Sequence, residues 1–87
     1  MSDAIYSVRI KASAAKAILR INASDRRRIV EAIDRLAYEP SAGSALKGEF
    51  GGLRRLRVGR YRVIYETSHE ELTVLVVRIG NRGKVYR

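Results

Sequence analysis

The sequence contains no cysteine and no tryptophan, and it has one histidine, His69, and one proline, Pro40. Without cysteine, neither a disulfide framework nor a thiolate metal site can form. A single histidine leaves little scope for a zinc site or for a histidine-based triad. No apolar run approaches the roughly 20 residues of a membrane span, and residues 1–11 lack the apolar stretch of a signal peptide. These absences predict a cytoplasmic protein that works without a membrane, a metal or another cofactor.

Acidic residues are also scarce. The 87 residues carry 18 lysines and arginines against 9 aspartates and glutamates, which gives a formal net charge of +9. Such an excess favours a polyanionic partner: nucleic acid, an acidic protein or an anionic membrane. Arginine dominates the basic residues after residue 53, and its planar fork can grip a phosphate in two places. The alternative is that these charges only make the surface soluble.

The length fits one domain, residues 1–87, with one core. The first half has helical spacing. Residues 4–10 read as a short strand, and Ser13 and Ser24 are candidate caps of two helices, with Asp25 in the first turn of the second. Pro40 ends the second helix at or before residue 39. The predicted buried positions recur three and four residues apart: Ala14, Ala17, Ile18 and Ile21, then Ile29, Ile33, Leu36 and Ala37.

The second half has strand patterns, after a loop at residues 41–52. Strands are predicted at residues 53–58, 61–67 and 72–79, followed by a turn at 80–83 and an extended tail at 84–87. The last of these strands is apolar on both faces, with Val74 and Val76 against Leu75, Val77 and Ile79, as in the interior of a sheet. The order is therefore β-α-α-β-β-β with a terminal tail, an α+β fold with a helical hairpin and a mainly antiparallel sheet.

Gly59 and Arg60 fit a two-residue hairpin turn, in which glycine supplies the positive φ of a type II′ turn. This turn fixes the register and separates two faces. One face carries apolar side chains for the core, and the other carries Arg55, Arg57, Arg62 and Ile64. Arginines crowded on one face repel each other, and an anion between them relieves that repulsion. The alternative is a solvated charged face.

Arg82 and Tyr86 follow the last long strand. A cradle of guanidinium groups with a phenol at its edge suits RNA, because it can hold a phosphodiester and stack on a base. It also suits RNA cleavage. The 2′-hydroxyl of RNA is a built-in nucleophile, so an enzyme needs only to position it, remove its proton and stabilise the charged transition state.

Three segments resemble the RelE/ParE toxin superfamily in their order and spacing. They are residues 52–65 (GLRRLRVGRYRVIY), residues 77–82 (VRIGNR) and residues 85–87 (VYR). The resemblance covers essentially the whole chain. It implies two helices against a small, mainly antiparallel sheet, and a toxin of a type II toxin–antitoxin system. It further implies a ribosome-dependent, metal-independent endoribonuclease (an mRNA interferase) that cuts mRNA in the ribosomal A site and inhibits translation.

The resemblance also implies roles for single residues. Arg62 corresponds to the arginine at the scissile phosphate, Arg82 to the arginine that stabilises the transition state or leaving group, and Tyr86 to the general base. Arg55 corresponds to a basic residue of the same RNA-binding cradle. Arg57 is expected to contact the RNA backbone because it shares their face.

Other family traits leave alternatives open. Leu53 stands where the best-known ribosome-dependent members carry a basic residue. Asn81 stands where many relatives have histidine, and Gly83 where many have a charged residue. These departures imply altered codon preference, weaker activity or another target. The alternatives are a ParE-like inhibitor of DNA gyrase without nuclease activity, and an inactive module that only binds antitoxin. The expected partners are an acidic cognate antitoxin, in a complex that forms a higher oligomer, and the ribosome with its mRNA.

Overall fold

The computed structural model describes residues 5–46 and 52–81. Five strands form one sheet in the order β1-β5-β4-β3-β2, in which β1 runs parallel to β5 and the other neighbours are antiparallel. The α+β fold predicted from the sequence is confirmed. The elements in chain order are β1 (Ser7–Ile10), α1 (Ala12–Leu19), α2 (Ala23–Arg35), β2 (Ser44–Ala45), β3 (Leu53–Val58), β4 (Tyr61–Ser68) and β5 (Thr73–Asn81).

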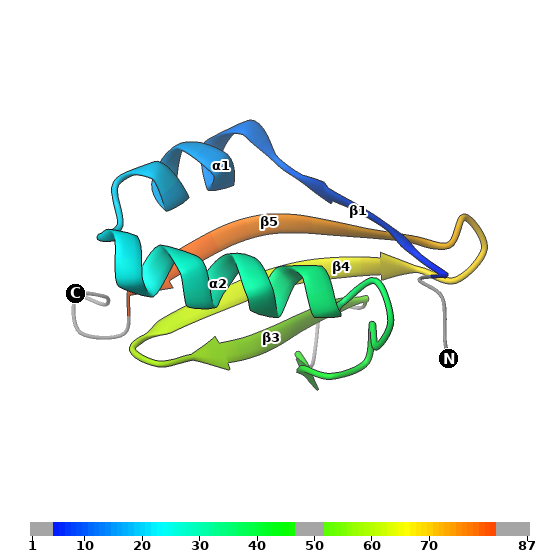
Figure 1. Cartoon of the computed structure of the whole chain (residues 1–87). Coiled ribbons are helices and arrows are strands. Elements are labelled where there is room, and N and C mark those ends of the chain that lie inside the picture. Colours follow the sequence, from blue (N-terminus) through cyan, green and yellow to red (C-terminus); the bar gives the residue numbers. More distant parts are fainter. Residues whose placement is uncertain (1–4, 47–51, 82–87) are drawn as a thin grey trace.

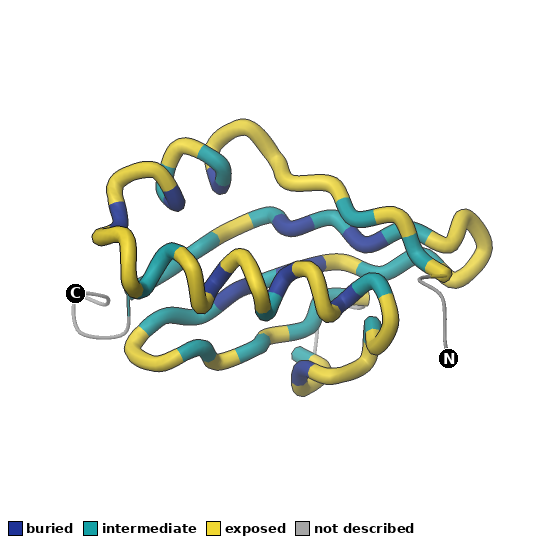
Figure 2. Tube along the Cα trace, viewed as in Figure 1, coloured by how far each residue is buried: buried dark blue, intermediate teal, exposed yellow. Residues whose placement is uncertain are grey.

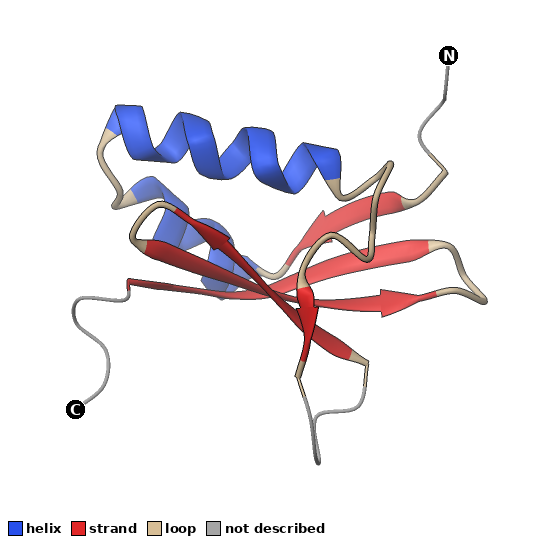
Figure 3. Ribbon diagram, turned by 90° about the horizontal axis from the view of Figure 1, so that it is seen from below, coloured by secondary structure: helices blue, strands red, loops and turns tan. Residues whose placement is uncertain are grey.

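The two helices run in opposite directions and cover one face of the sheet (Figure 1). The other face carries no helix from the described part of the chain, as the view from below makes clear (Figure 3). No helix within residues 5–46 and 52–81 is long and apolar enough to cross a membrane. One face of the sheet therefore forms the core, and the other, which we call the open face, is covered by no helix of the described residues.

Both helices begin slightly earlier than their sequence predicts. The N-cap of α1 is Lys11, which makes no side-chain capping bond, and the N-cap of α2 is Asn22. The Asn22 side chain accepts a hydrogen bond from the Asp25 backbone N–H (2.9 Å) and donates one to the Asp25 carboxylate (3.0 Å). This reciprocal pair satisfies a free N–H at the helix start, so Asn22 takes the cap in place of Ser24. The prediction of Ser13 as a cap is likewise wrong.

The core lies between the helices and the covered face of the sheet (Figure 2). Of the predicted helix positions, Ala17 and Ala37 are only half-buried, and the others are buried as expected. Burying a large aliphatic side chain stabilises a fold by about 1.5–3 kcal/mol, so these apolar stripes hold the helices on the sheet. The buried core consists of Ala14, Ile18, Ile21, Ile29, Ile33, Leu36, Val63, Tyr65, Val74 and Val76.

Strand β5 contains a β-bulge. Ile64 of β4 pairs with Arg78, yet the next residue, Tyr65, pairs with Val76, so Val77 is the extra residue. A bulge shifts the alternation of side chains by one position. Before it, Val76 faces the helices, and beyond it Ile79 takes that side and packs against the core. The prediction that Ile79 shares a face with Leu75 is therefore wrong, as is the prediction that Gly80 begins a turn, because β5 continues to Asn81.

The predicted loop at residues 41–52 contains a short edge strand, β2, which pairs with Arg54 and Arg55. The segment before it is held by Tyr65, whose side chain is fully buried. The Tyr65 hydroxyl donates to the Pro40 carbonyl (2.8 Å) and accepts from the Gly43 N–H (2.9 Å). Gly43 lies so close to β3 that an added Cβ would be 2.5 Å from the Arg55 carbonyl oxygen. A side chain at residue 43 would therefore push β2 away from the sheet.

We expect Tyr65→Phe to lower the free energy of unfolding by about 1–3 kcal/mol, because it leaves a buried N–H without its partner. Urea unfolding followed by circular dichroism measures this change. Tyr38→Phe is the matched control, since Tyr38 is 53% exposed and should unfold at the wild-type midpoint. An unchanged midpoint for Tyr65→Phe would show that the hydroxyl does not hold the segment.

Candidate arginine-lined site

The open face of the sheet gathers arginines near the β3–β4 turn. Arg57 lies directly opposite Arg62, and Arg55 lies opposite Ile64, as the sequence predicts. On β5, Gly80 is the partner of Arg62, and Arg78 is the partner of Ile64. Because Val63 and Tyr65 point into the core, their neighbours on β4 point to the open face. We call Arg55, Arg57, Arg62 and Arg78 together the arginine face.

The local sequence explains this arrangement. Gly59 has φ of +60°, while Arg60 is not among the residues with positive φ, a combination that fits the predicted type II′ turn. The turn brings β3 and β4 together without a register shift between them. The three residue pairs next to the turn then alternate between the two faces of the sheet. The arginine in the middle of each segment, Leu-Arg-Val on β3 and Tyr-Arg-Val on β4, therefore faces outward.

Arg78 was not among the residues that the sequence singled out. Counted in strict alternation from Val74 and Val76, its side chain would point into the core. The bulge at Val77 reverses the alternation and places Arg78 on the open face, where it is exposed. Bulges are frequent beside active sites, where they redirect a side chain. No signal in the all-apolar run before Arg78 indicates the bulge.

The arginine face is strongly positive. Directly opposed like charges destabilise a sheet, and Arg57 and Arg62 form such a pair. Arg55, Arg57 and Arg78 are exposed and Arg62 is half-buried. Within the described residues the core contains no charged side chain.

Gly80 provides space next to Arg62. A Cβ added at Gly80 would meet no atom of residues 5–46 or 52–81 within 4 Å, so with respect to these residues the position presents bare backbone. A ligand can approach the sheet closely there, with guanidinium groups on the neighbouring strands. Arginines on the same face as this space suit a phosphodiester, because an arginine fork donates two parallel hydrogen bonds to a phosphate.

The structure thus brings together three of the predicted site residues: Arg55, Arg57 and Arg62. Arg82 and Tyr86 lie outside the described residues, as does Gly83. Leu53 also lies on the open face, one pair beyond Arg55, where it is opposite Glu66. Asn81 ends β5 opposite Tyr61, on the side of the helices. Within residues 5–46 and 52–81, no three His, Asp or Glu side chains come close enough to hold a metal ion.

The sequence matches the family described as the ParE toxin of the type II toxin–antitoxin system parDE, over residues 5–86. The toxin RelG of Mycobacterium tuberculosis (strain ATCC 25618 / H37Rv) is 31% identical over 84 residues, which cover 94% of this chain and 97% of RelG.

Two solved structures contain chains that are similar to this one over most of its length. The archaeal RelE–RelB complex from Pyrococcus horikoshii OT3 contains a chain that is 31% identical, with a TM-score of 0.80, covering 93% of this chain and 99% of that one. A chain of the toxin–antitoxin complex RelBE2 from Mycobacterium tuberculosis is 29% identical, with a TM-score of 0.81, and the match covers 88% of this chain and 98% of that one. The family match and these relatives agree with the fold, and the chain therefore belongs to the RelE/ParE superfamily of type II toxin–antitoxin toxins.

Proposed function

We propose that the chain is a ribosome-dependent endoribonuclease that cuts mRNA in the ribosomal A site and is held inactive by an acidic antitoxin. The arginine face carries this proposal. Arg62 lies beside Gly80, with Arg57 on the strand beyond it and Arg78 two residues along β5, so several guanidinium groups can reach one phosphate there. Arg62 has the central place, opposite Arg57 and next to Gly80.

In the proposed reaction the RNA itself supplies the nucleophile. The 2′-hydroxyl attacks the adjacent phosphorus and loses its proton to a base, a role that the resemblance gives to Tyr86. The bond from phosphorus to the 5′-oxygen breaks, and the leaving oxygen takes up a proton from water or from an acid at the site. The products are a 2′,3′-cyclic phosphate on one fragment and a 5′-hydroxyl on the other. Negative charge grows on the phosphate oxygens during this step, and guanidinium groups fixed around them lower the barrier. We assign the positive charge that balances it to Arg62 and Arg82, while Arg55, Arg57 and Arg78 hold the RNA backbone.

The antitoxin has support from relatives. The similar chains from Pyrococcus horikoshii and Mycobacterium tuberculosis were solved in toxin–antitoxin complexes. A toxin with a net charge of +9 is best matched by an acidic partner, whose association is accelerated by electrostatic steering. We propose that acidic side chains of this antitoxin cover the arginine face and so compete with RNA.

Brief induction of the chain in cells without its antitoxin tests the activity. Sequencing of RNA fragments with 5′-hydroxyl ends should show cuts inside translated codons. A drug that blocks initiation, and so empties messages of ribosomes, should abolish these cuts. Cuts that persist on ribosome-free messages would contradict the dependence on the ribosome.

The second candidate is inhibition of DNA gyrase, since the matching family is described as ParE toxins. The same induction distinguishes the two. Double-strand DNA breaks with intact messages would support gyrase as the target, and the absence of any growth effect would support a module that only binds antitoxin.

A further inference from the structure

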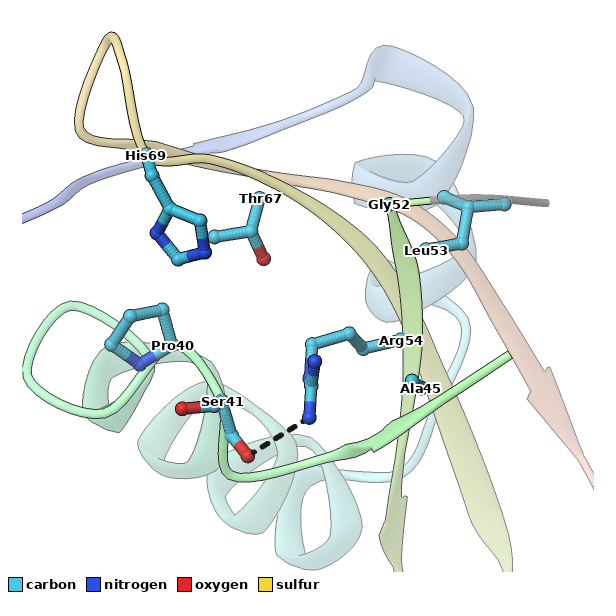
Figure 4. Close-up of a pocket in the computed structure, with 8 residues that line it drawn as sticks. All are labelled: Pro40, Ser41, Ala45, Gly52, Leu53, Arg54, Thr67 and His69. Carbon is cyan, nitrogen blue, oxygen red and sulfur yellow. Dashed lines mark hydrogen bonds between the residues drawn. The ribbon is translucent and has the colours of Figure 1, made fainter. Parts of the chain in front are cut away.

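A second polar site lies on the opposite side of the sheet from the arginine face. It is a pocket of about 140 Å³ between the loop after α2 and the ends of β3 and β4. Arg54 pairs with Tyr65, and Thr67 is two residues further along β4, so both side chains lie on the helix side of the sheet. Figure 4 shows His69 and Thr67 on one side of the hollow and Arg54, Ser41 and Pro40 on the other. The remaining lining residues are Ala45, Gly52 and Leu53.

Arg54 supplies a fixed cation. Its Nε donates to the Gly43 carbonyl (3.0 Å), and one terminal nitrogen is 3.4 Å from the Ser41 carbonyl oxygen. A guanidinium has five N–H donors, so these two bonds hold the group in place and leave donors for a ligand. The group is half-buried, where its charge is less screened than at the open surface.

Thr67 supplies a hydroxyl without a partner. Its Oγ1 is buried and makes no hydrogen bond to any described residue. A buried polar atom left unpaired costs about 1–3 kcal/mol, and native structures rarely retain one unless a water or a ligand satisfies it. Thr67 is one of the residues that line the pocket, so a small shift of its side chain would let a ligand there supply the missing partner.

His69 supplies a third polar group. Its Nδ1 is 2.6 Å from the Tyr6 hydroxyl, and the two rings meet edge to face. When the phenol donates to Nδ1, the proton of a neutral imidazole is on Nε2. The ring extends toward Thr67 in the close-up, with its second nitrogen on that side (Figure 4). Nε2 can then donate into the pocket.

We propose that this pocket binds one small oxyanion, a carboxylate or a phosphate group. Its described lining residues combine a cation, hydroxyl donors and an imidazole with apolar walls, and none of them is an Asp or a Glu. A water occupies about 30 Å³ of liquid, so the space admits a group of a few heavy atoms. This site is separate from the arginine face, because their side chains leave the sheet in opposite directions. The anion comes either from a partner's acidic side chain or from free phosphate.

Site-resolved NMR of the full chain tests the proposal. The His69 ring and the Thr67 amide are followed during titration with orthophosphate and, separately, with N-acetyl-aspartyl amide. We expect a saturable shift at both residues with at least one probe. Thr67→Val keeps the shape, removes only an unpaired hydroxyl and should not lower the urea midpoint, while binding should weaken about tenfold, the effect of losing one hydrogen bond to a charged ligand.

A double variant, Arg55→Gln with Arg57→Gln, controls for anions on the other face and should leave the His69 titration unchanged. Tighter binding of the aspartyl probe identifies a protein side chain as the source, and tighter binding of orthophosphate identifies a free anion. The proposal is overturned if His69 shows no saturable shift, if Thr67→Val binds as wild type, or if the double variant abolishes the shift.

Discussion

Replacing Arg62 with alanine is expected to leave a folded protein that no longer arrests growth and that cuts mRNA about 10²–10³-fold more slowly, the usual cost of removing one donor from a transition-state site. Arg62 lies between Arg57 and Gly80 at the centre of the arginine face. The change removes a half-buried surface side chain, and such truncations rarely cost much stability. The loss should therefore appear in the rate and not in the urea midpoint.

Two further variants sharpen this test. Arg62→Lys keeps the charge but loses the planar fork, so its rate should fall between those of wild type and Arg62→Ala. Arg35→Ala makes the same change in charge on the exposed side of α2 and should cut at the wild-type rate. If Arg62→Ala still stops growth while mRNA stays intact, the toxicity has another target, and gyrase becomes the leading one.

Tyr86→Phe should retain ribosome binding and lose cleavage by about 10²–10⁴-fold, the range of general acid–base catalysis. The substitution keeps the aromatic ring, so stacking on a base is preserved, and it removes only the hydroxyl that would accept the 2′-proton. Single-turnover cleavage of ribosome-bound mRNA measures the rate, and co-sedimentation with ribosomes measures binding.

Tyr38→Phe is the matched control for this experiment too, because Tyr38 is an exposed tyrosine on the helix side. Its rate should equal that of wild type. Wild-type cleavage by Tyr86→Phe would remove the hydroxyl from the mechanism and leave proton removal to another group. A joint loss of binding and cleavage would instead assign the tyrosine to RNA recognition.

The hairpin at the centre of the site was predictable residue by residue. Gly59 fixes the turn, the turn fixes the register, and the register decides which side chains share a face, so Arg55, Arg57 and Arg62 follow from local chemistry alone. The helix stripes were predictable for the same reason, since their spacing reflects one buried side. The caps were not, because Asn22 and Ser24 are both good caps and only the contact with Asp25 decides between them.

Other features depend on contacts between distant segments. Strand β2 has two residues and forms because β3 lies beside it. The segment that leads into β2 is held by the hydroxyl of Tyr65, which belongs to β4. The pocket at Arg54 joins residues from separate parts of the chain, and nothing in the sequence around His69 indicates that they meet. The bulge in β5 is hidden in an apolar run, because a strand with apolar residues on both faces gives no sign of a shift in register.

That bulge has a consequence for how such a protein evolves. A bulge lets a strand hold one codon more than its partner while the paired residues keep their faces, because the extra residue stays out of the ladder. Loss of the Val77 codon would leave Val76 and Arg78 adjacent and still opposite Tyr65 and Ile64, so Arg78 would stay on the open face and Ile79 on the core side. We therefore expect an in-frame deletion of Val77 to be tolerated, although it shortens a central strand of the sheet.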